Sequence, residues 1–223
     1  MPSGARTRAK LTYERLKDAY PAVTELAHRD PFQLLIATIL SAQTTDRSVN
    51  LVTPELFRRY PTAAELAAAD PAVVETLIRP TGFFRAKTRS IIAASRKLVE
   101  LFDGGVPDNI DDLVKLPGIG RKTANVILGV GFGVPGFAVD THVRRLTNLL
   151  KLTASKDPVK IERQVCSIVP KGEWTGLSLR LILHGRRICV ARRPRCEECI
   201  LNDFCPSSRT RPKLTRRPSS YPC

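Results

Sequence analysis

The sequence predicts an all-α fold, because apolar residues recur at the three- and four-residue spacing of amphipathic helices along most of the chain. Many of these segments also open on a proline, or on an aspartate that suits a helix N-cap. No useful run of strict apolar and polar alternation, the pattern of a half-buried strand, interrupts them. We therefore expect about ten helices and no sheet.

The first half of the chain contains six predicted helices. The first has a basic outer face, whereas the second, which begins at Pro31 after Asp30, is apolar on nearly every side and should be buried at the centre of the protein. Prolines separate the later helices of this half, and Pro80-Thr81-Gly82 forms a break before the longest helix. These helices cover residues 6–20, 31–40, 49–57, 62–68, 71–78 and 86–102, the last with its basic residues outward.

The second half begins with a helix that Asp108 should cap and that ends at Pro117. A tight turn rich in glycine then leads into a helix from Arg121 to about Phe132. Residues 206–223, rich in Pro, Ser and basic residues, should form a disordered tail. The remaining predicted helices cover residues 140–150, 157–169 and 173–187.

The composition indicates a polyanionic partner. The chain has 223 residues, enough to bury a full core, and its 36 Lys and Arg against 21 Asp and Glu give a formal charge of +15. Leaving out the tail still leaves a strongly basic globular part. This excess of cations, with a pI near 10.1, favours nucleic acid as the partner.

No stretch predicts a membrane span or a secretion signal. The longest uncharged run, 126–139, is interrupted by glycines and is shorter than the roughly 20 residues that a spanning helix needs. The N-terminal segment is charged where a signal peptide needs an apolar centre. We therefore expect a cytoplasmic, monomeric protein with no membrane partner.

Four of the six cysteines lie in one short loop after the last predicted helix, at positions Cys189, Cys196, Cys199 and Cys205. Four thiols this close in an intracellular chain indicate a metal centre. Zinc sites usually draw two pairs of ligands from separated turns, whereas one winding loop suits a four-cysteine 4Fe-4S cluster. We expect the cluster, with zinc and then disulfides as alternatives. Cys166 and Cys223 stand apart, and we assign them no role.

The same loop is basic. Arg186 and Arg187 precede it, and Arg192, Arg193 and Arg195 stand between its first two cysteines. A cluster could fold these arginines into a fixed surface that contacts phosphate. Alternatively, the arginines keep the loop soluble and offset the negative charge of the cluster.

The turn Pro117-Gly118-Ile119-Gly120 is a candidate phosphate site. Its glycines let the backbone come close to a ligand, and the amides that open the next helix converge where the helix dipole favours an anion. Gly118, Gly120 and Arg121 are therefore candidate DNA contacts. An ordinary connection between two helices is the alternative.

Five segments combine this turn with further polar motifs. They read LLIATILSAQTTDRSVN (34–50), IRPTGFFRAKT (78–88), LPGIGRKTANVIL (116–128), VDTHVRRL (139–146) and LILHGRRICVARRPRCEECILNDFC (181–205). With Lys122, Asp140 and the cysteine spacing, they resemble the endonuclease III family of bifunctional DNA glycosylases and AP lyases. The turn alone occurs in many DNA-binding proteins, but the combination is specific.

The resemblance implies two helical domains with a DNA-binding cleft between them. A six-helix barrel would cover residues 22–134, with the helix-hairpin-helix at about 108–132. A second domain, from residues 6–21 and 135–205, would hold the 4Fe-4S cluster, which would be structural or redox-sensing. The implied partner is double-stranded DNA with damaged bases, by default oxidised pyrimidines, or abasic sites, and the protein would associate with the nucleoid.

The resemblance also assigns the chemistry to Lys122 and Asp140. Lys122 would attack C1′ of the sugar to give a Schiff base, after which β-elimination cuts the strand, and Asp140 would accept a proton and stabilise the sugar cation. The helix after Gly120 rises roughly 18 Å and the stretch behind it reaches about 23 Å, so Asp140 can return to Lys122. The simpler roles are a phosphate contact for Lys122 and an N-cap for Asp140.

A target base must leave the duplex stack, so the resemblance further assigns residues that fill the gap. Gln43 would occupy the space left by the base. The loop Thr81-Gly82-Phe83 would wedge the opposite strand, with Phe83 intercalating. The alternatives are a helix-end cap for Gln43 and a core position for Phe83.

Two other functions are compatible with parts of the sequence. An adenine-specific mismatch glycosylase of the same superfamily shares the cluster and the aspartate, but it usually lacks the lysine and carries a further C-terminal domain. A non-catalytic DNA-binding module would use the hairpin for grip and the cluster as a structural or redox element. The presence of Lys122, with only 18 residues after Cys205, favours the bifunctional enzyme.

Overall fold

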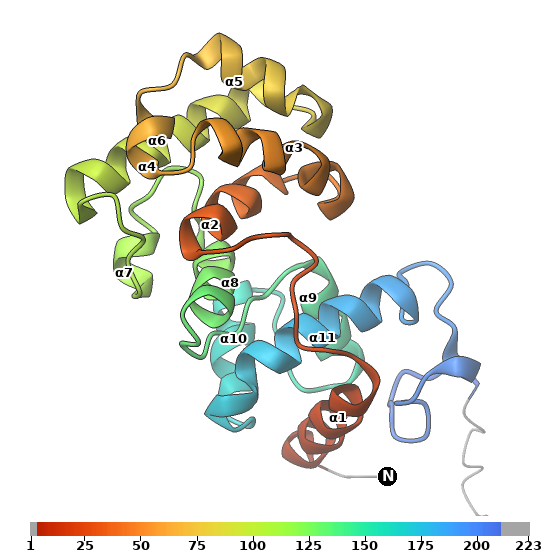
Figure 1. Ribbon diagram of the computed structural model, residues 1–223. Coiled ribbons are helices and arrows are strands. Elements are labelled where there is room, and N and C mark those ends of the chain that lie inside the picture. Colours follow the sequence, from red (N-terminus) through yellow and green to blue (C-terminus); the bar gives the residue numbers. More distant parts are fainter. Residues whose placement is uncertain (1–3, 211–223) are drawn as a thin grey trace, which may run out of the picture.

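The computed structural model describes residues 4–210, and all regular structure within them is helical. The all-α prediction is confirmed, since this part of the chain contains no strand. Figure 1 shows the helices gathered in two lobes, one above the other, with the chain passing between them near α8. Within residues 4–210, no helix combines the length and the apolar character that crossing a bilayer requires.

The first lobe is built around α2. Every residue of this helix except Pro31 and Gln33 is buried, which confirms the central position predicted for it. Asp30 caps the helix by accepting a hydrogen bond from the Gln33 amide at 2.8 Å. The lobe comprises α2 (Pro31–Leu40), α3 (Asp46–Arg59), α4 (Ala63–Ala67), α5 (Pro71–Ile78), η1 (Arg79–Thr81), α6 (Phe84–Phe102), α7 (Ile110–Leu113) and α8 (Arg121–Gly131).

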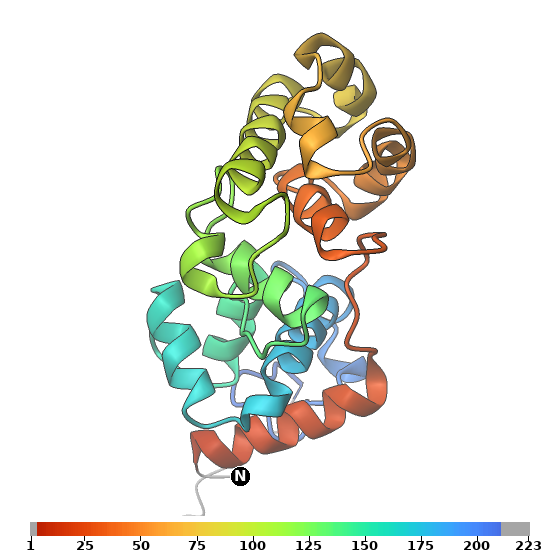
Figure 2. The ribbon, with the colours of Figure 1, turned by 60° about the vertical axis from the view of Figure 1, so that its left-hand side comes forward.

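The second lobe has a separate core to which both halves of the chain contribute. Ala9 and Leu16 of the N-terminal helix are buried together with residues from Phe137 to Phe204. Figure 2 shows α1 lying across the base of this lobe. The lobe comprises α1 (Ala5–Ala19), α9 (Thr141–Leu149), α10 (Pro158–Cys166), η2 (Lys171–Glu173), α11 (Trp174–Arg187) and η3 (Cys196–Glu198). The predicted domain limits, 22–134 against 6–21 with 135–205, stay predictions.

One predicted helix cap is wrong. Asn109, and not Asp108, caps the helix before the glycine turn, because its Oδ1 accepts a hydrogen bond from the Asp112 amide at 2.9 Å. Asn and Asp are equally good N-caps, so two adjacent candidates could not be ranked from the sequence. The helix that follows, α7, ends at Leu113, and the turn therefore begins earlier than Pro117.

A second difference concerns α6. Its basic residues were all expected to face outward, but Lys87 is buried. The residue lies on the same helical face as Ile91, Ala94 and Leu98, and its ammonium donates a hydrogen bond to the Thr81 carbonyl at 2.8 Å. A main-chain acceptor beneath the helix therefore replaces solvent around this lysine.

The predicted tail is described only in part. Residues 206–210 lie against the second lobe, where the Ser207 hydroxyl donates to the Leu149 carbonyl at 2.8 Å. Residues 211–223, with Cys223, lie outside the described part of the chain, and so does the rest of the prediction of disorder.

Candidate active site and cluster loop

The turn between α7 and α8 presents an uncapped helix start. Gly118 lies at φ 83°, a conformation that glycine adopts without a steric penalty, while buried Leu116 and Ile119 fix the turn to the first core. Gly120 is the N-cap of α8 and has no side chain to offer, whereas α2, α3, α9 and α10 each receive a side-chain oxygen. The first amides of α8 therefore have no side-chain cap.

Lys122 and Asp140 line one pocket of about 80 Å³ between the two lobes. Lys122 is exposed in the first turn of α8, and Asp140 directly precedes α9. No hydrogen bond or ion pair of the Lys122 ammonium is found within residues 4–210. The other lining residues come from both lobes and from the segment that joins them: Val23, Thr24, Glu25, Leu26, Thr38, Ser41, Asp46, Val126, Leu179, Ile182, Leu183 and Arg186.

Asp140 is also the N-cap of α9. Its Oδ1 accepts a hydrogen bond from the Val143 amide at 2.8 Å, so the N-cap role that the sequence predicted as the simpler alternative is present. The other carboxylate oxygen has no hydrogen-bond donor within residues 4–210. Burial lowers the pKa of the neighbouring His142, with the charge of Asp140 acting in the opposite direction. The cap thus fixes the carboxylate while one oxygen stays available to the pocket.

Gln43 and Phe83 share an unusual backbone conformation. Both lie in the left-handed region, at φ 55° and 48°, and both are exposed, Phe83 at 66%. Among residues 4–210 the other non-glycine residues with positive φ are Asp103 and Lys151, which stand one and two residues after helix ends, where this conformation is common. A bulky aromatic in this region is strained, and its exposure excludes a core position for Phe83.

Thr81, the first residue of the same loop, is turned inward. It is buried, and its hydroxyl donates a hydrogen bond to the Ile78 carbonyl at 2.8 Å. Its side chain therefore shapes the loop from below. The predicted contact of Thr81 with DNA stays a prediction.

Arg121 and Arg186, both predicted to contact DNA, are engaged within the protein. Arg121 forms a two-pronged ion pair with Glu162 on α10, at 2.9 and 2.8 Å. Arg186 on α11 bridges Glu25 at 2.7 Å and Asp46 at 2.9 Å, which ties the two lobes together. A phosphate would have to replace these carboxylates, and both contacts stay predictions. Asp46 belongs to the motif segment 34–50, whereas Glu25 and Glu162 lie outside all the motif segments of the sequence.

The four loop cysteines surround one cavity of about 150 Å³, which Arg145 also lines. The cysteines are Cys189, Cys196, Cys199 and Cys205. Within the described residues, no three His, Cys, Asp or Glu side chains converge as the ligands of a single ion would. Four cysteines from one loop that line one cavity are the ligand set of a 4Fe-4S cluster.

Hydrogen-bond donors flank these cysteines. His184 Nε2 lies 3.4 Å from Cys199 Sγ, and its Nδ1 lies 3.1 Å from the Tyr20 hydroxyl. Burial lowers the pKa of His184 to about 4, so the ring is neutral and fits a donor to sulfur at Nε2 and an acceptor from Tyr20 at Nδ1. Arg145 donates to the Cys189 carbonyl at 2.7 Å. Such donors stabilise the negative charge of an iron-thiolate cluster.

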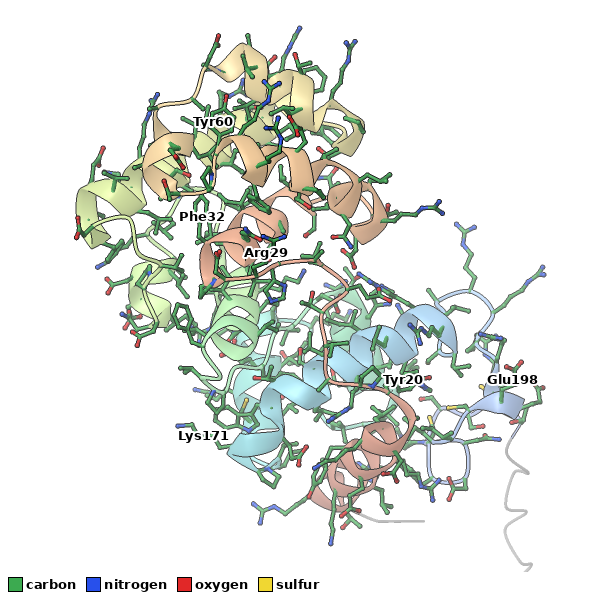
Figure 3. The ribbon with its side chains drawn as sticks, viewed as in Figure 1. Tyr20, Arg29, Phe32, Tyr60, Lys171 and Glu198 are labelled. Atoms are coloured by element: carbon green, nitrogen blue, oxygen red, sulfur yellow. The ribbon has the colours of Figure 1, made fainter. Side chains whose placement is uncertain are left out.

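The arginines of the loop fall into two groups. Arg195 pairs with Glu198 at 3.1 Å and donates to the Arg187 carbonyl, so it holds the loop in shape. Arg192 and Arg193 are exposed, and no hydrogen bond or ion pair of their side chains is found within residues 4–210. Figure 3 shows the sulfur atoms gathered beside the turn that bears Glu198. Arg192 and Arg193 therefore project from a loop whose shape the cluster would fix.

Known protein families match both parts of this site. The HhH-GPD superfamily of base excision DNA repair proteins matches residues 36–171, and the iron-sulfur binding domain of endonuclease III matches residues 189–205, from the first loop cysteine to the last. Endonuclease III of Synechocystis sp. is 51% identical over 195 residues, which are 86% of this chain and 89% of that protein. The chain belongs to the endonuclease III family.

Solved structures of this family have the same architecture. A non-covalent endonuclease III–DNA complex matches with a TM-score of 0.85 and 40% identity, covering 91% of this chain and 95% of that one. A trapped endonuclease III–DNA covalent intermediate matches with the same TM-score and 41% identity, covering 91% and 96%. The predicted family, fold class and 4Fe-4S cofactor are thus confirmed.

Proposed function

We propose that Lys122 and Asp140 carry out base excision and strand cleavage in this protein. As a member of the endonuclease III family, the protein is a DNA glycosylase and AP lyase of base excision repair. The observation that carries the residue assignment is the pocket itself, which an exposed lysine without an ion pair and a carboxylate with one free oxygen both line. Oxidised pyrimidines are the substrates that we propose, with the nucleoid in the cytoplasm as the place of action.

The reaction follows from these two groups. The bond between base and sugar breaks as the base takes a proton from water, and the free oxygen of Asp140 stabilises the positive charge that develops at C1′. Asp140 accepts a proton from the Lys122 side chain, whose nitrogen bonds to the same carbon. A second proton moves from this nitrogen to O4′ as the sugar ring opens, which gives the Schiff base. Loss of a proton from C2′ then expels the 3′ phosphate, and water releases Lys122.

The DNA grip is proposed for the start of α8. A Cβ at Gly120 would meet nothing within 4 Å, so no crowding inside the protein requires a glycine there. Close approach of a phosphate to uncapped amides does require one. Gln43 and Phe83 would enter the duplex, and Arg192 and Arg193 would contact the backbone farther along it.

Covalent trapping tests the assignment. With borohydride and a duplex that contains an abasic site, the parent protein should form a stable cross-link, and Lys122→Ala should form none while it still binds the duplex. Lys160→Ala is the matched control, because Lys160 is also an exposed lysine in the first turn of a helix. Cross-linking by Lys122→Ala at the parental yield would refute the proposal.

A further inference from the structure

We propose that Lys87 is a positioning residue for base extrusion, because it braces the loop that carries Phe83. The inference rests on the proposed function, in which Phe83 enters the duplex beside the damaged base. Lys87 lies one helical turn after Phe83 and is only 5% exposed. No ion pair of Lys87 is found within residues 4–210, and its ammonium donates to the Thr81 carbonyl at 2.8 Å.

Packing alone does not explain a lysine at this position. A buried ammonium without a counter-charge is uncommon and costly, and methionine or leucine would fill the same space without that cost. The site offsets part of this cost, because the acceptor is the last carbonyl of η1, which continues α5, and the ammonium therefore lies at the negative end of a helix. The burial also lowers the pKa of Lys87.

The loop above Lys87 is strained and needs an anchor. Gly82 and Phe83 have successive positive φ angles of 66° and 48°, and the exposed ring of Phe83 gains little packing in return. Lys87 holds both ends of this pair. Its side chain binds the Thr81 carbonyl before the pair, and its amide donates to the Phe83 carbonyl after it, at 3.1 Å.

This bracing of the loop matters when Phe83 has to separate stacked bases of the duplex. A side chain that separates stacked bases must keep its position while the stack pushes back, and a loop free to relax would lose that position. Lys87 therefore acts through Phe83, and only where a base has to be turned out. An abasic site contains no base to extrude, so its cleavage depends much less on the brace.

Two reactions distinguish this role from a general structural one. Lys87→Met keeps an unbranched side chain that is one atom shorter and removes the donor. Removal of an oxidised pyrimidine from a duplex should fall about tenfold, the scale of one strained residue, while cleavage at a preformed abasic site should stay within about twofold. Lys97→Met, an exposed position on the same helix, should match the parent in both reactions.

A double variant links Lys87 to the wedge. Phe83→Ala with Lys87→Met should be no slower in base removal than Phe83→Ala alone, and the fluorescence of 2-aminopurine beside the lesion should show the same loss of extrusion in each variant. A double variant that removes the base more slowly than Phe83→Ala alone would overturn the proposal. So would a loss of abasic cleavage in Lys87→Met as large as its loss of base removal. So would parental base removal by Lys87→Met.

Two further outcomes are informative. Should Lys87→Met not fold, Thr81→Ala removes the hydroxyl bond to Ile78 on the other side of the loop and should give the same selective loss. Parental base removal by Phe83→Ala would refute the wedge, and the brace with it. Failure of Lys122→Ala to block cross-linking would refute the catalytic assignment instead, and would leave the extrusion result standing.

Discussion

At the scale of single residues, Asp140 uses its two oxygens for different purposes. One accepts the Val143 amide and begins α9, and the other faces the pocket that Lys122 shares. In the proposed mechanism, the helix start and the chemistry therefore depend on separate atoms of one side chain. Substitutions can remove the second function and keep the first.

Asp140→Asn should fold like the parent and should slow base removal by orders of magnitude. Asparagine caps a helix as well as aspartate, so the free energy of unfolding should change by less than about 0.5 kcal/mol. A neutral amide cannot stabilise the sugar cation. Asp140→Ala, which also loses the cap, should cost about 1 kcal/mol. Denaturant unfolding and single-turnover base release measure the two effects, and parental base release by Asp140→Asn would contradict the assignment.

Sequence reasoning at this scale is strong where one segment carries the signal. Lys122 follows the glycine turn directly, and Asp140 could be returned to it by chain length alone. Lys87 was missed because an isolated lysine in an amphipathic helix normally faces solvent. The signal that could have found it is its register, four residues before buried Ile91 on the apolar face.

At the scale of helices, α9 and α11 approach each other closely at Gly185. A Cβ at this position would lie 2.9 Å from His142 Cβ, a separation that side chains do not tolerate. Arg145 of α9 reinforces the contact by donating to the Gly185 carbonyl at 3.1 Å. Because Asp140 begins α9 and the cluster loop follows α11, this contact links the pocket to the cluster.

Gly185→Ala should destabilise the protein by about 1–3 kcal/mol, because overpacking at this contact outweighs the gain in helix propensity. Thermal unfolding of the cluster-loaded protein, followed by circular dichroism, measures the change. Gly172→Ala is the control, since a Cβ there would meet nothing within 4 Å, and it should stay within about 0.5 kcal/mol of the parent. A Gly185→Ala protein as stable as its parent would show that the helices separate without cost.

Helix starts were predictable where a proline or a single capping residue stands alone, as at Pro31 and Pro158. Where Asp108 and Asn109 compete, tertiary packing decides, and the sequence does not record that choice. Strained backbone conformations were not predictable from the sequence. Nothing in the letters around Gln43 or Phe83 indicates a left-handed conformation, because residues of these types usually avoid it.

At the scale of the whole molecule, the formal charge of +15 overstates the free positive surface. Arg121 and Arg186 are bound to carboxylates, whereas Lys122, Arg192 and Arg193 are not. The grip on DNA should therefore come from a limited set of free cations together with the amides of α8. Each phosphate contact adds a released counterion to the binding equilibrium.

Affinity for duplex DNA should fall steeply as salt rises. Changing both Arg192 and Arg193 to Gln should lower the slope of log K against log salt by about 2, one for each lost phosphate contact. Arg58→Gln should leave the slope closer to that of the parent, because Arg58 is already paired with Glu55. Fluorescence anisotropy over a salt series gives the slopes, and a flat response would contradict a phosphate-based grip.

The second lobe packs helix α1 against residues that are translated much later. The first lobe buries residues between Leu26 and Leu128, so its core is complete as soon as that stretch has left the ribosome. Helix α1 emerges earlier, yet Ala9 and Leu16 pack against residues from Phe137 to Phe204. Helix α1 is therefore among the last of these helices to dock, and its apolar face stays exposed until residues 137–204 have been translated.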